Sequence, residues 1–306
     1  MKILILGYSN LVKTKILPFF RSHKISYSIA SKSQLINDKS CKHKFKNYNE
    51  ALNKSKANIV YISLANINHF YWAKKSLEKN YHVIVDKPIT LDLSQTKELI
   101  NLAKKKSKLI SESIFFNYNI QYKNLNNLIR NENIDHVNIN FVYPYPYKRK
   151  ILISKKLGGG IIADTLPYVA AIARIYCKTN LLQVYKIIKK NIDNLPIKCN
   201  LLLQFENCTI SCYLSFGIEY DNQITFFSKN KKIIVNRAFS TPVNTNMTIK
   251  YYYLNSKYEK NFITDNSFKN YFLEVLKNIK NNNFDIYHSS ILKDSEFKNK
   301  IFKNKL

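Results

Sequence analysis

The sequence predicts an α/β protein in which a doubly wound parallel sheet is followed by an α+β domain with a mostly antiparallel sheet. Short β-branched runs alternate with amphipathic segments over residues 1–117, as in a parallel sheet covered by helices. From residue 182 to about 263 the pattern changes to short alternating segments typical of antiparallel strands. The 306 residues suffice for two domains, which we expect over 1–117 and 118–306, with a last helix that can pack back on the first domain.

Composition narrows the class of protein. No apolar run reaches the roughly 18 residues of a membrane span, so we expect no membrane insertion. The first ten residues, MKILILGYSN, have a short apolar stretch without a small-residue cleavage site, which favours a first strand over a signal peptide. The five cysteines form no CxxC pair, so the sequence indicates neither a metal site nor a disulfide framework. These features favour the reducing cytoplasm.

The net charge of +29 invites a nucleic-acid interpretation. The lysines are spread over the whole chain, together with abundant asparagine, isoleucine and tyrosine, as in the proteins of AT-rich genomes. We therefore expect no specific nucleic-acid partner. Non-specific polyanion binding at low salt is still expected.

The first strand, residues 2–6, leads into a degenerate glycine motif. The sequence after it reads Gly7-Tyr-Ser9-Asn10-Leu11-Val12, with only the first glycine of G-x-G-x-x-G in place. A helix then carries Val12, Ile16, Leu17 and Phe20 on one face. Such a turn allows the backbone to approach a pyrophosphate at a helix N-terminus.

The second strand, residues 25–30, ends at Ser31 and Lys32. An acidic residue at this place would bind a ribose 2′-hydroxyl group, whereas a basic residue suits a 2′-phosphate. The sequence therefore favours NADP(H) over NAD(H). An ordinary polar turn is the alternative.

The remaining elements of the first domain follow in order. We expect helices over residues 49–55, from 69 onward and over 91–103, and strands over residues 58–63, 82–85 and 108–112. The helix from residue 69 would direct Trp72, Ala73 and Leu77 inward.

Asp86-Lys87-Pro88 follows the strand at 82–85. Lys87 thus lies at the carboxyl end of a parallel strand, where ligands of such sheets bind. Pro88 biases Lys87 toward an extended backbone, which restricts where the lysine points. A solvated loop lysine is the alternative.

The second domain opens with an expected helix over residues 119–131 and a strand over 136–143. Three of the five glycines, 158–160, precede an apolar helix that carries Asp164 and Tyr168. Four residues apart, these two side chains share one side of the helix. Taken alone, they are more often a capping carboxylate and a core tyrosine.

Alternating segments predict the second sheet. We expect strands over residues 184–189, 197–205, 209–216, 223–227, 232–235 and 250–254, then helices over 268–280 and 289–302. Cys208 and Cys212 would share one face of a strand, and we interpret both as structural.

Three motifs together resemble the glucose–fructose oxidoreductase/inositol dehydrogenase (Gfo/Idh/MocA) family. Asn66-x-x-His69, Asp86-Lys87-Pro88 and Glu112 with trailing aromatic residues correspond to the family's P-N-x-x-H, E-K-P and M-E-A-F-x-x-R-Y. The opening motif is similar to G-C-A-D-I-A of the sugar-nucleotide ketoreductase branch. Residues 158–168 resemble G-G-G-x-x-x-D-x-G-x-H/Y but depart from the commonest pattern at Thr165 and Leu166.

The resemblance implies an NAD(P)-binding Rossmann domain and a catalytic set of Lys87, Asp164 and Tyr168. Tyr168 would give a proton to the substrate oxygen, Lys87 would hydrogen-bond the same oxygen, and Asp164 would orient the sugar hydroxyl or the lysine. The cofactor would be lined by Gly7, Ser9, Asn10, Leu11, Ser31, Lys32, Leu64, Asn66, His69, Asp86, Lys87 and Glu112.

The implied activity is hydride transfer between NADP(H) and a ring carbon of a sugar or sugar nucleotide, in surface glycan or deoxysugar synthesis. The partners would be that small molecule and further copies of the chain, as a dimer or tetramer. A non-catalytic dinucleotide-binding regulator on the same fold is the alternative.

Overall fold

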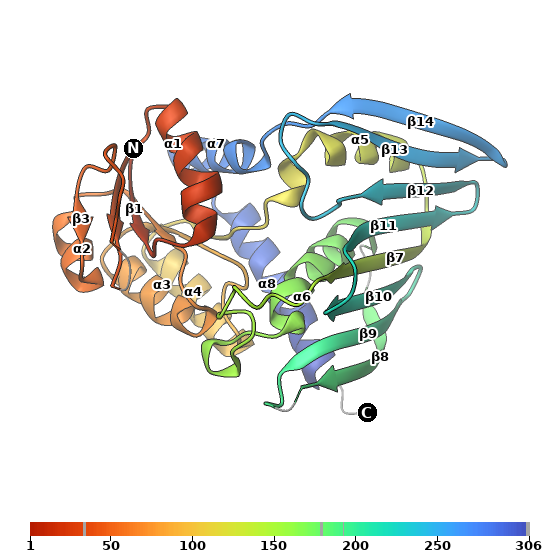
Figure 1. Ribbon diagram of the computed structural model, residues 1–306, viewed down its shortest axis with the longest axis horizontal. Helices are drawn as coiled ribbons and strands as arrows, with labels where there is room; N and C mark the ends of the chain where they lie inside the picture. Colours follow the sequence, from red (N-terminus) through yellow and green to blue (C-terminus); the bar gives the residue numbers. More distant parts are fainter. Residues whose placement is uncertain (33–34, 178–179, 192, 304–306) are drawn as a thin grey trace. The chain divides into compact units, whose positions relative to one another are not determined.

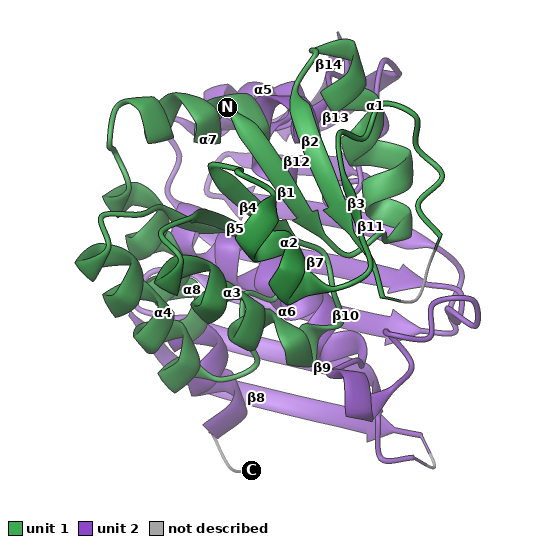
Figure 2. Ribbon diagram, turned by 90° about the vertical axis from the view of Figure 1, so that its left-hand side faces the viewer, with its two compact units in different colours: residues 1–113, 271–295 green, residues 114–270, 296–306 purple. Residues whose placement is uncertain are grey.

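The computed structural model describes residues 1–32, 35–177, 180–191 and 193–303. The chain forms two compact units (Figure 2). Unit 1 combines residues 1–113 with 271–295, and unit 2 combines residues 114–270 with the chain from 296 onward.

Unit 1 is built on a parallel sheet. Its described strands are β1 (Lys2–Leu6), β2 (Ser26–Ala30), β3 (Lys44–Phe45), β4 (Ile59–Ile62), β5 (His82–Val85) and β6 (Ile110–Glu112). They lie in the order β3-β2-β1-β4-β5-β6, and every neighbouring pair is parallel. The predicted doubly wound sheet is confirmed.

Helices cover both faces of this sheet, which explains its continuous apolar strands. All four residues of β4 are buried. The helices of unit 1 are α1 (Leu17–Ser22), α2 (Tyr48–Lys54), α3 (His69–Glu78), α4 (Leu93–Lys105) and parts of α7 (Ser267–Lys280) and α8 (Asp285–Lys303).

Helices α2, α3 and α4 pack on one face of the unit 1 sheet. On the other face, Phe20 of α1 and Phe272 of α7 contact each other, and Phe272 also contacts Tyr61 of β4.

Two helices of unit 1 begin at side-chain caps that the sequence places before them. The Asn47 side chain accepts hydrogen bonds from the N–H groups of Asn49 and Glu50, and α2 begins there. The Asp92 side chain does the same at the start of α4. Each cap satisfies N–H groups that have no acceptor within the helix.

Unit 2 contains a second, larger sheet. Its described strands are β7 (Ile134–Tyr143), β8 (Leu181–Lys190), β9 (Pro196–Phe205), β10 (Thr209–Phe216), β11 (Asp221–Ser228), β12 (Lys231–Asn236), β13 (Asn246–Tyr253) and β14 (Ser256–Ile263). They lie in the order β14-β13-β12-β11-β7-β10-β9-β8, with β7 and β10 parallel and the other pairs antiparallel (Figure 1).

One face of this sheet carries the core of unit 2. Along β9, buried Cys199, Leu201 and Leu203 alternate with more exposed side chains, as expected for a strand packed on one side. The buried face packs against α5 (Ile120–Ile129), α6 (Ile161–Ile172) and the last turns of α8. The described helices include none that is long and apolar enough to cross a membrane.

The sequence-based prediction missed β3 and β14. Strand β3 has only two residues, too few to show a period. Strand β14 follows β13 through a two-residue turn at Leu254 and Asn255, whose φ angles are +46° and +66°. Hairpin turns of this kind usually contain glycine, and Leu254 gives no such signal, so the sequence predicted only the strand over residues 250–254. Helix α8 also begins four residues earlier than expected.

Candidate active site

The candidate cofactor site begins where Gly7 crosses the end of β4. Gly7 has a φ of +101°, and a Cβ atom placed on it would lie 2.1 Å from the Ser63 carbonyl oxygen. Only glycine tolerates both conditions. The Gly7 N–H group also donates a 2.9 Å hydrogen bond to the Ala30 carbonyl oxygen. Gly7 thus brings together the carboxyl ends of three strands at the topological switch point, where dinucleotides bind in such sheets.

Ser9 organises the helix start that follows. Its Oγ accepts a 3.1 Å hydrogen bond from the Val12 N–H group and lies 2.8 Å from the Ser63 Oγ. The helical stretch begins at Asn10, which is exposed, and continues through half-buried Leu11. The first N–H groups of a helix have no acceptor within it and favour an anion. The predicted residues therefore fit the pyrophosphate of a dinucleotide.

Lys32 lies at the end of β2 with its charge held over aromatic rings. Its Nζ is 5.1 Å from the Tyr48 ring centroid and 5.8 Å from that of Trp72. Such contacts favour a cation at this place. Neighbouring Ser31 is buried, and its N–H group donates to the Phe45 carbonyl oxygen of β3. A cation at this sheet edge suits a ribose 2′-phosphate.

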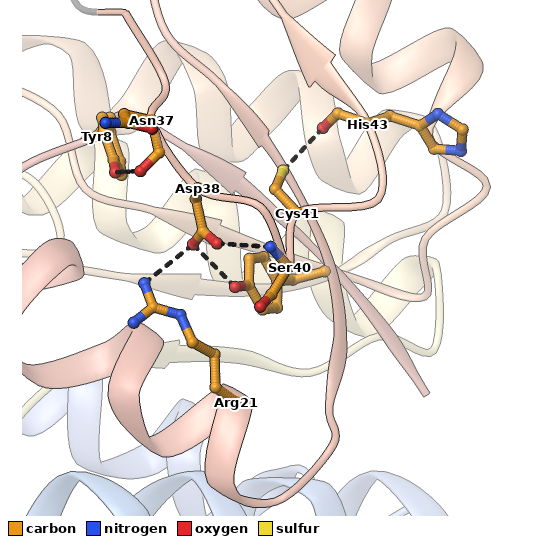
Figure 3. A network of polar contacts seen from close by, with 8 residues as sticks. Tyr8, Arg21, Asn37, Asp38, Ser40, Cys41 and His43 are labelled. Carbon is orange, nitrogen blue, oxygen red and sulfur yellow. Dashed lines mark hydrogen bonds and ion pairs between the residues drawn. The ribbon is translucent and has the colours of Figure 1, made fainter.

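Asp38 anchors the described segment around residues 37–40, as Figure 3 shows. The Asp38 Oδ2 accepts hydrogen bonds from Arg21 Nη2 at 3.1 Å and from the Tyr27 hydroxyl at 2.8 Å. Its Oδ1 accepts the Ser40 N–H at 2.9 Å. Tyr8, beside Gly7, donates from its hydroxyl to the Asn37 carbonyl oxygen at 3.3 Å. The glycine turn is therefore tied to this segment.

Burial by itself would raise the pKa of Asp38, because it disfavours the carboxylate. The hydrogen bonds from Tyr27, the Ser40 N–H and Arg21 outweigh this effect, and the pKa of Asp38 is lowered. The ionised carboxylate is thus the form that the folded unit stabilises.

His69 and Glu112 support the loop that carries Lys87. His69 is fully buried, with Nδ1 2.7 Å from the Pro88 carbonyl oxygen and Nε2 3.1 Å from the Leu64 carbonyl oxygen. The Glu112 Oε1 accepts a 2.8 Å hydrogen bond from the Ile89 N–H. These side chains have protein partners, so they hold the ends of β4, β5 and β6 together. Asn66 is buried at the start of the short helical turn before α3.

Asp86 connects the Lys87 loop to the glycine turn. Its carboxylate accepts hydrogen bonds from the Tyr61 hydroxyl and, at 2.5 Å, from the Ser63 Oγ. Because Ser63 also contacts Ser9, one chain of hydrogen bonds runs from the glycine turn to the residue before Lys87. Burial raises the pKa of Asp86. Sequence reasoning did not select Tyr61 or Ser63, although both stand at the end of the predicted strand 58–63.

Asp164 and Tyr168 lie on α6 of unit 2. The Tyr143 hydroxyl donates a 2.5 Å hydrogen bond to the Asp164 Oδ2, and burial, followed by the Asp164 charge, raises the pKa of Tyr143. The Tyr168 ring stacks on Phe239 at 5.1 Å and is flanked by Phe116. Tyr143 was not selected from the sequence, because only the fold places the end of β7 beside this helix.

The structure thus groups the predicted residues within each unit. The predicted cofactor residues and Lys87 belong to unit 1, while Asp164 and Tyr168 belong to unit 2. Their roles in cofactor binding and catalysis stay predictions. Among the described residues, no cluster of histidine, cysteine or acidic side chains could hold a metal ion.

Residues 1–114 match the oxidoreductase family Gfo/Idh/MocA, which has an NAD-binding Rossmann fold. This match covers the first 114 of the chain's 306 residues. The motif-based resemblance is therefore confirmed, as is the dinucleotide-binding fold.

Curated proteins similar to this chain include dTDP-3,4-didehydro-2,6-dideoxy-alpha-D-glucose 3-reductases. The protein from Saccharopolyspora spinosa is 26% identical over 213 residues, which cover 66% of this chain and 63% of the relative. The protein from Actinomadura kijaniata is 24% identical over 201 residues, which cover 64% of this chain and 60% of the relative. The chain thus matches less than two thirds of the length of these relatives.

The fold of both units recurs in a solved structure. KijD10, a 3-ketoreductase from Actinomadura kijaniata, was solved in complex with NADP and TDP-benzene. Its TM-score against this chain is 0.91 at 16% sequence identity, covering 99% of this chain and 97% of KijD10. The likeness shows that both sheets belong to one known architecture.

Asp38→Ala is expected to lower the free energy of unfolding by about 1–3 kcal/mol at pH 7, mainly because the Tyr27 hydroxyl and the Ser40 N–H lose their acceptor. Arg21 is half-exposed, so its ion pair contributes little. Since folding lowers the pKa of Asp38, its contribution is fully present above about pH 4 and is lost as the pH falls through the lowered value.

Urea unfolding of wild type and variant between pH 2.5 and pH 7 tests this expectation. Glu50→Ala is the control, because Glu50 forms an exposed ion pair with Lys54 on α2. Equal stability of the two variants at pH 7 would contradict the anchoring role of Asp38.

Proposed function

We propose that the chain transfers a hydride between NADP(H) and a ring carbon of a sugar or sugar nucleotide. The observation that carries the proposal is the carboxyl edge of the unit 1 sheet. There, Gly7, the helix start at Ser9 and the Lys87 loop are joined through Ser63 and Asp86. A dinucleotide turn connected through Asp86 to the loop that carries a lysine is expected of an enzyme that acts on its cofactor.

The proposed cofactor preference rests on Lys32. Its ammonium group lies over Tyr48 and Trp72 at the end of β2, and Ser31 precedes it. The first acidic residue after β2 along the chain is Asp38, whose carboxylate is occupied by Arg21 and Tyr27. A cation at the end of this strand, with no acidic residue directly after the strand in the sequence, favours a 2′-phosphate over a 2′-hydroxyl group.

When bound, the nicotinamide supplies the hydride. Reduction of a ketone leaves negative charge on the substrate oxygen, which needs a proton. In our proposal Tyr168 donates that proton and Lys87 stabilises the oxygen by a charge-assisted hydrogen bond. Asp164, fixed by the Tyr143 hydroxyl, orients a substrate hydroxyl or the lysine. General acid assistance of this kind is worth about 10²–10⁴ in rate.

The substrate class is proposed from the relatives. Two are named as reductases of a dTDP-linked deoxysugar, and KijD10 is named as a 3-ketoreductase. We therefore place this chain among enzymes of deoxysugar or surface glycan synthesis. The alternative, a dinucleotide-binding regulator, needs the glycine turn of unit 1 but not the Tyr143–Asp164 pair or Tyr168 on α6.

Lys87→Ala and Tyr168→Phe are expected to lower kcat for reduction of a dTDP-linked 3-keto sugar by about 10²-fold or more, because each removes a group that acts on the reacting oxygen. For Tyr168→Phe the NADPH affinity should change little, and circular dichroism of both variants should match wild type. Lys257→Ala and Tyr258→Phe, both exposed on β14, are the controls. Wild-type protein that binds NADPH but reduces no keto-sugar nucleotide would favour the regulator instead.

Lys32→Ala is expected to weaken NADPH binding about tenfold and to leave NADH binding nearly unchanged, since only NADPH carries the 2′-phosphate. Nicotinamide fluorescence titration at physiological salt measures both affinities. Lys75→Ala is the matched control, because the Lys75 Nζ also lies over the Trp72 ring, at 5.7 Å. Equal wild-type affinity for NADPH and NADH would contradict the cofactor preference. If the wild type binds neither cofactor, the proposed oxidoreductase activity is contradicted.

A second copy of the chain is the proposed partner of the open face of the second sheet. Tyr185 and Leu202 are paired neighbours on β8 and β9, with exposed fractions of 57% and 45%, and Ile187 is 72% exposed. Exposed apolar side chains grouped on one sheet face are typical of an interface. Ile187→Lys is expected to convert a dimer or tetramer to monomer in light scattering. A monomeric wild type would contradict the proposal.

A further inference from the structure

Two cysteines that are far apart in the sequence meet in the core of unit 2. Cys177 ends the helical stretch that continues α6, and Cys208 lies in the turn between β9 and β10. Their sulfur atoms are 3.1 Å apart although the residues are 31 positions apart. Both residues are about 5% exposed.

The turn that carries Cys208 is held in place by the backbone. The Phe205 N–H donates a 2.8 Å hydrogen bond to the Cys208 carbonyl oxygen, which closes the β9–β10 hairpin. The two sulfur atoms would need to approach by only about 1 Å to reach the ~2.05 Å of a disulfide bond. Because both residues belong to unit 2, this approach requires no movement between units.

The contact also distinguishes the two thiols. The Cys177 thiol donates a hydrogen bond to the Cys208 sulfur and stabilises its thiolate. This bond lowers the pKa of Cys208 despite opposing effects of burial and of the Asp135 carboxylate. The thiolate is the reactive form of cysteine, so Cys208 is expected to react first.

We propose that Cys177 and Cys208 are a redox-active dithiol that a hydroperoxide oxidises to a disulfide. The Cys208 thiolate attacks the peroxide oxygen, the O–O bond breaks, and hydroxide leaves as water after taking up a proton. The resulting sulfenic acid is attacked by Cys177, the S–O bond breaks, and a second water leaves. Two thiols and one hydrogen peroxide thus give one disulfide and two waters, with the sulfur oxidised and the peroxide reduced.

The cross-link would tie the end of the α6 stretch to the β9–β10 hairpin. Closing a loop of 31 residues restricts the unfolded chain and stabilises the folded unit. Helix α6 carries Asp164 and Tyr168. Oxidation would therefore attach the helical stretch that continues this helix to the β9–β10 hairpin. The inference does not rest on the proposed function, because its primary readout is thiol chemistry.

The test treats purified full-length protein with hydrogen peroxide and then alkylates it with N-ethylmaleimide in denaturant. Wild type is expected to lose two of its five alkylatable thiols and to recover them with dithiothreitol. Mass spectrometry of the unreduced digest should show a peptide that joins residues 177 and 208. Oxidation should raise the Tm by about 5 °C.

Matched variants separate this pair from the other cysteines. Cys177→Ser and Cys208→Ser should each abolish the cross-link, whereas Cys41→Ser and Cys199→Ser should retain it. Retention of all five thiols, or a cross-link through Cys212 in place of Cys177, would overturn the proposal. If a serine variant does not fold, mass spectrometry of the unreduced wild-type digest still shows which two cysteines are cross-linked.

Discussion

The unit 1 site depends on the close approach of two backbone segments, at Gly7 and Ser63. A side chain on Gly7 would overlap the Ser63 carbonyl oxygen, so the glycine is required by contact as well as by its positive φ. This approach brings Ser63 to Ser9 and aligns the helix start with the end of β4. The degenerate motif therefore retains the one glycine that the geometry cannot replace.

Side chains that hydrogen-bond to other protein groups connect this contact to the loop that carries Lys87. Ser63 bonds Asp86, His69 bridges Leu64 and Pro88, and Glu112 accepts the Ile89 N–H. His69, Asp86 and Glu112, which are predicted to line the cofactor, thus also have protein partners. These bonds restrict the loop that carries Lys87, and a positioned side chain is what catalysis requires.

The sequence predicted most elements because their signals are local. The β-branched runs of β1 and β4 are buried on both faces, and the capping side chains Asn47 and Asp92 stand directly before their helices. Strand β14 was missed because the turn before it contains Leu254 at positive φ where glycine is expected. A local turn signal is therefore missing where the pairing of two long strands, and not the turn residue, stabilises the hairpin.

The amino-acid sequence by itself determined the fold class, because period and strand ends are properties of neighbouring residues. Its motifs also carried the family resemblance that implied the candidate residues. Only the tertiary structure decided which side chains meet across the chain. It paired Arg21 with Asp38, Tyr143 with Asp164, and Cys177 with Cys208. These contacts join residues that are 17 to 31 positions apart in the sequence. The side chains meet because of how helices pack on sheets, which no local sequence pattern encodes.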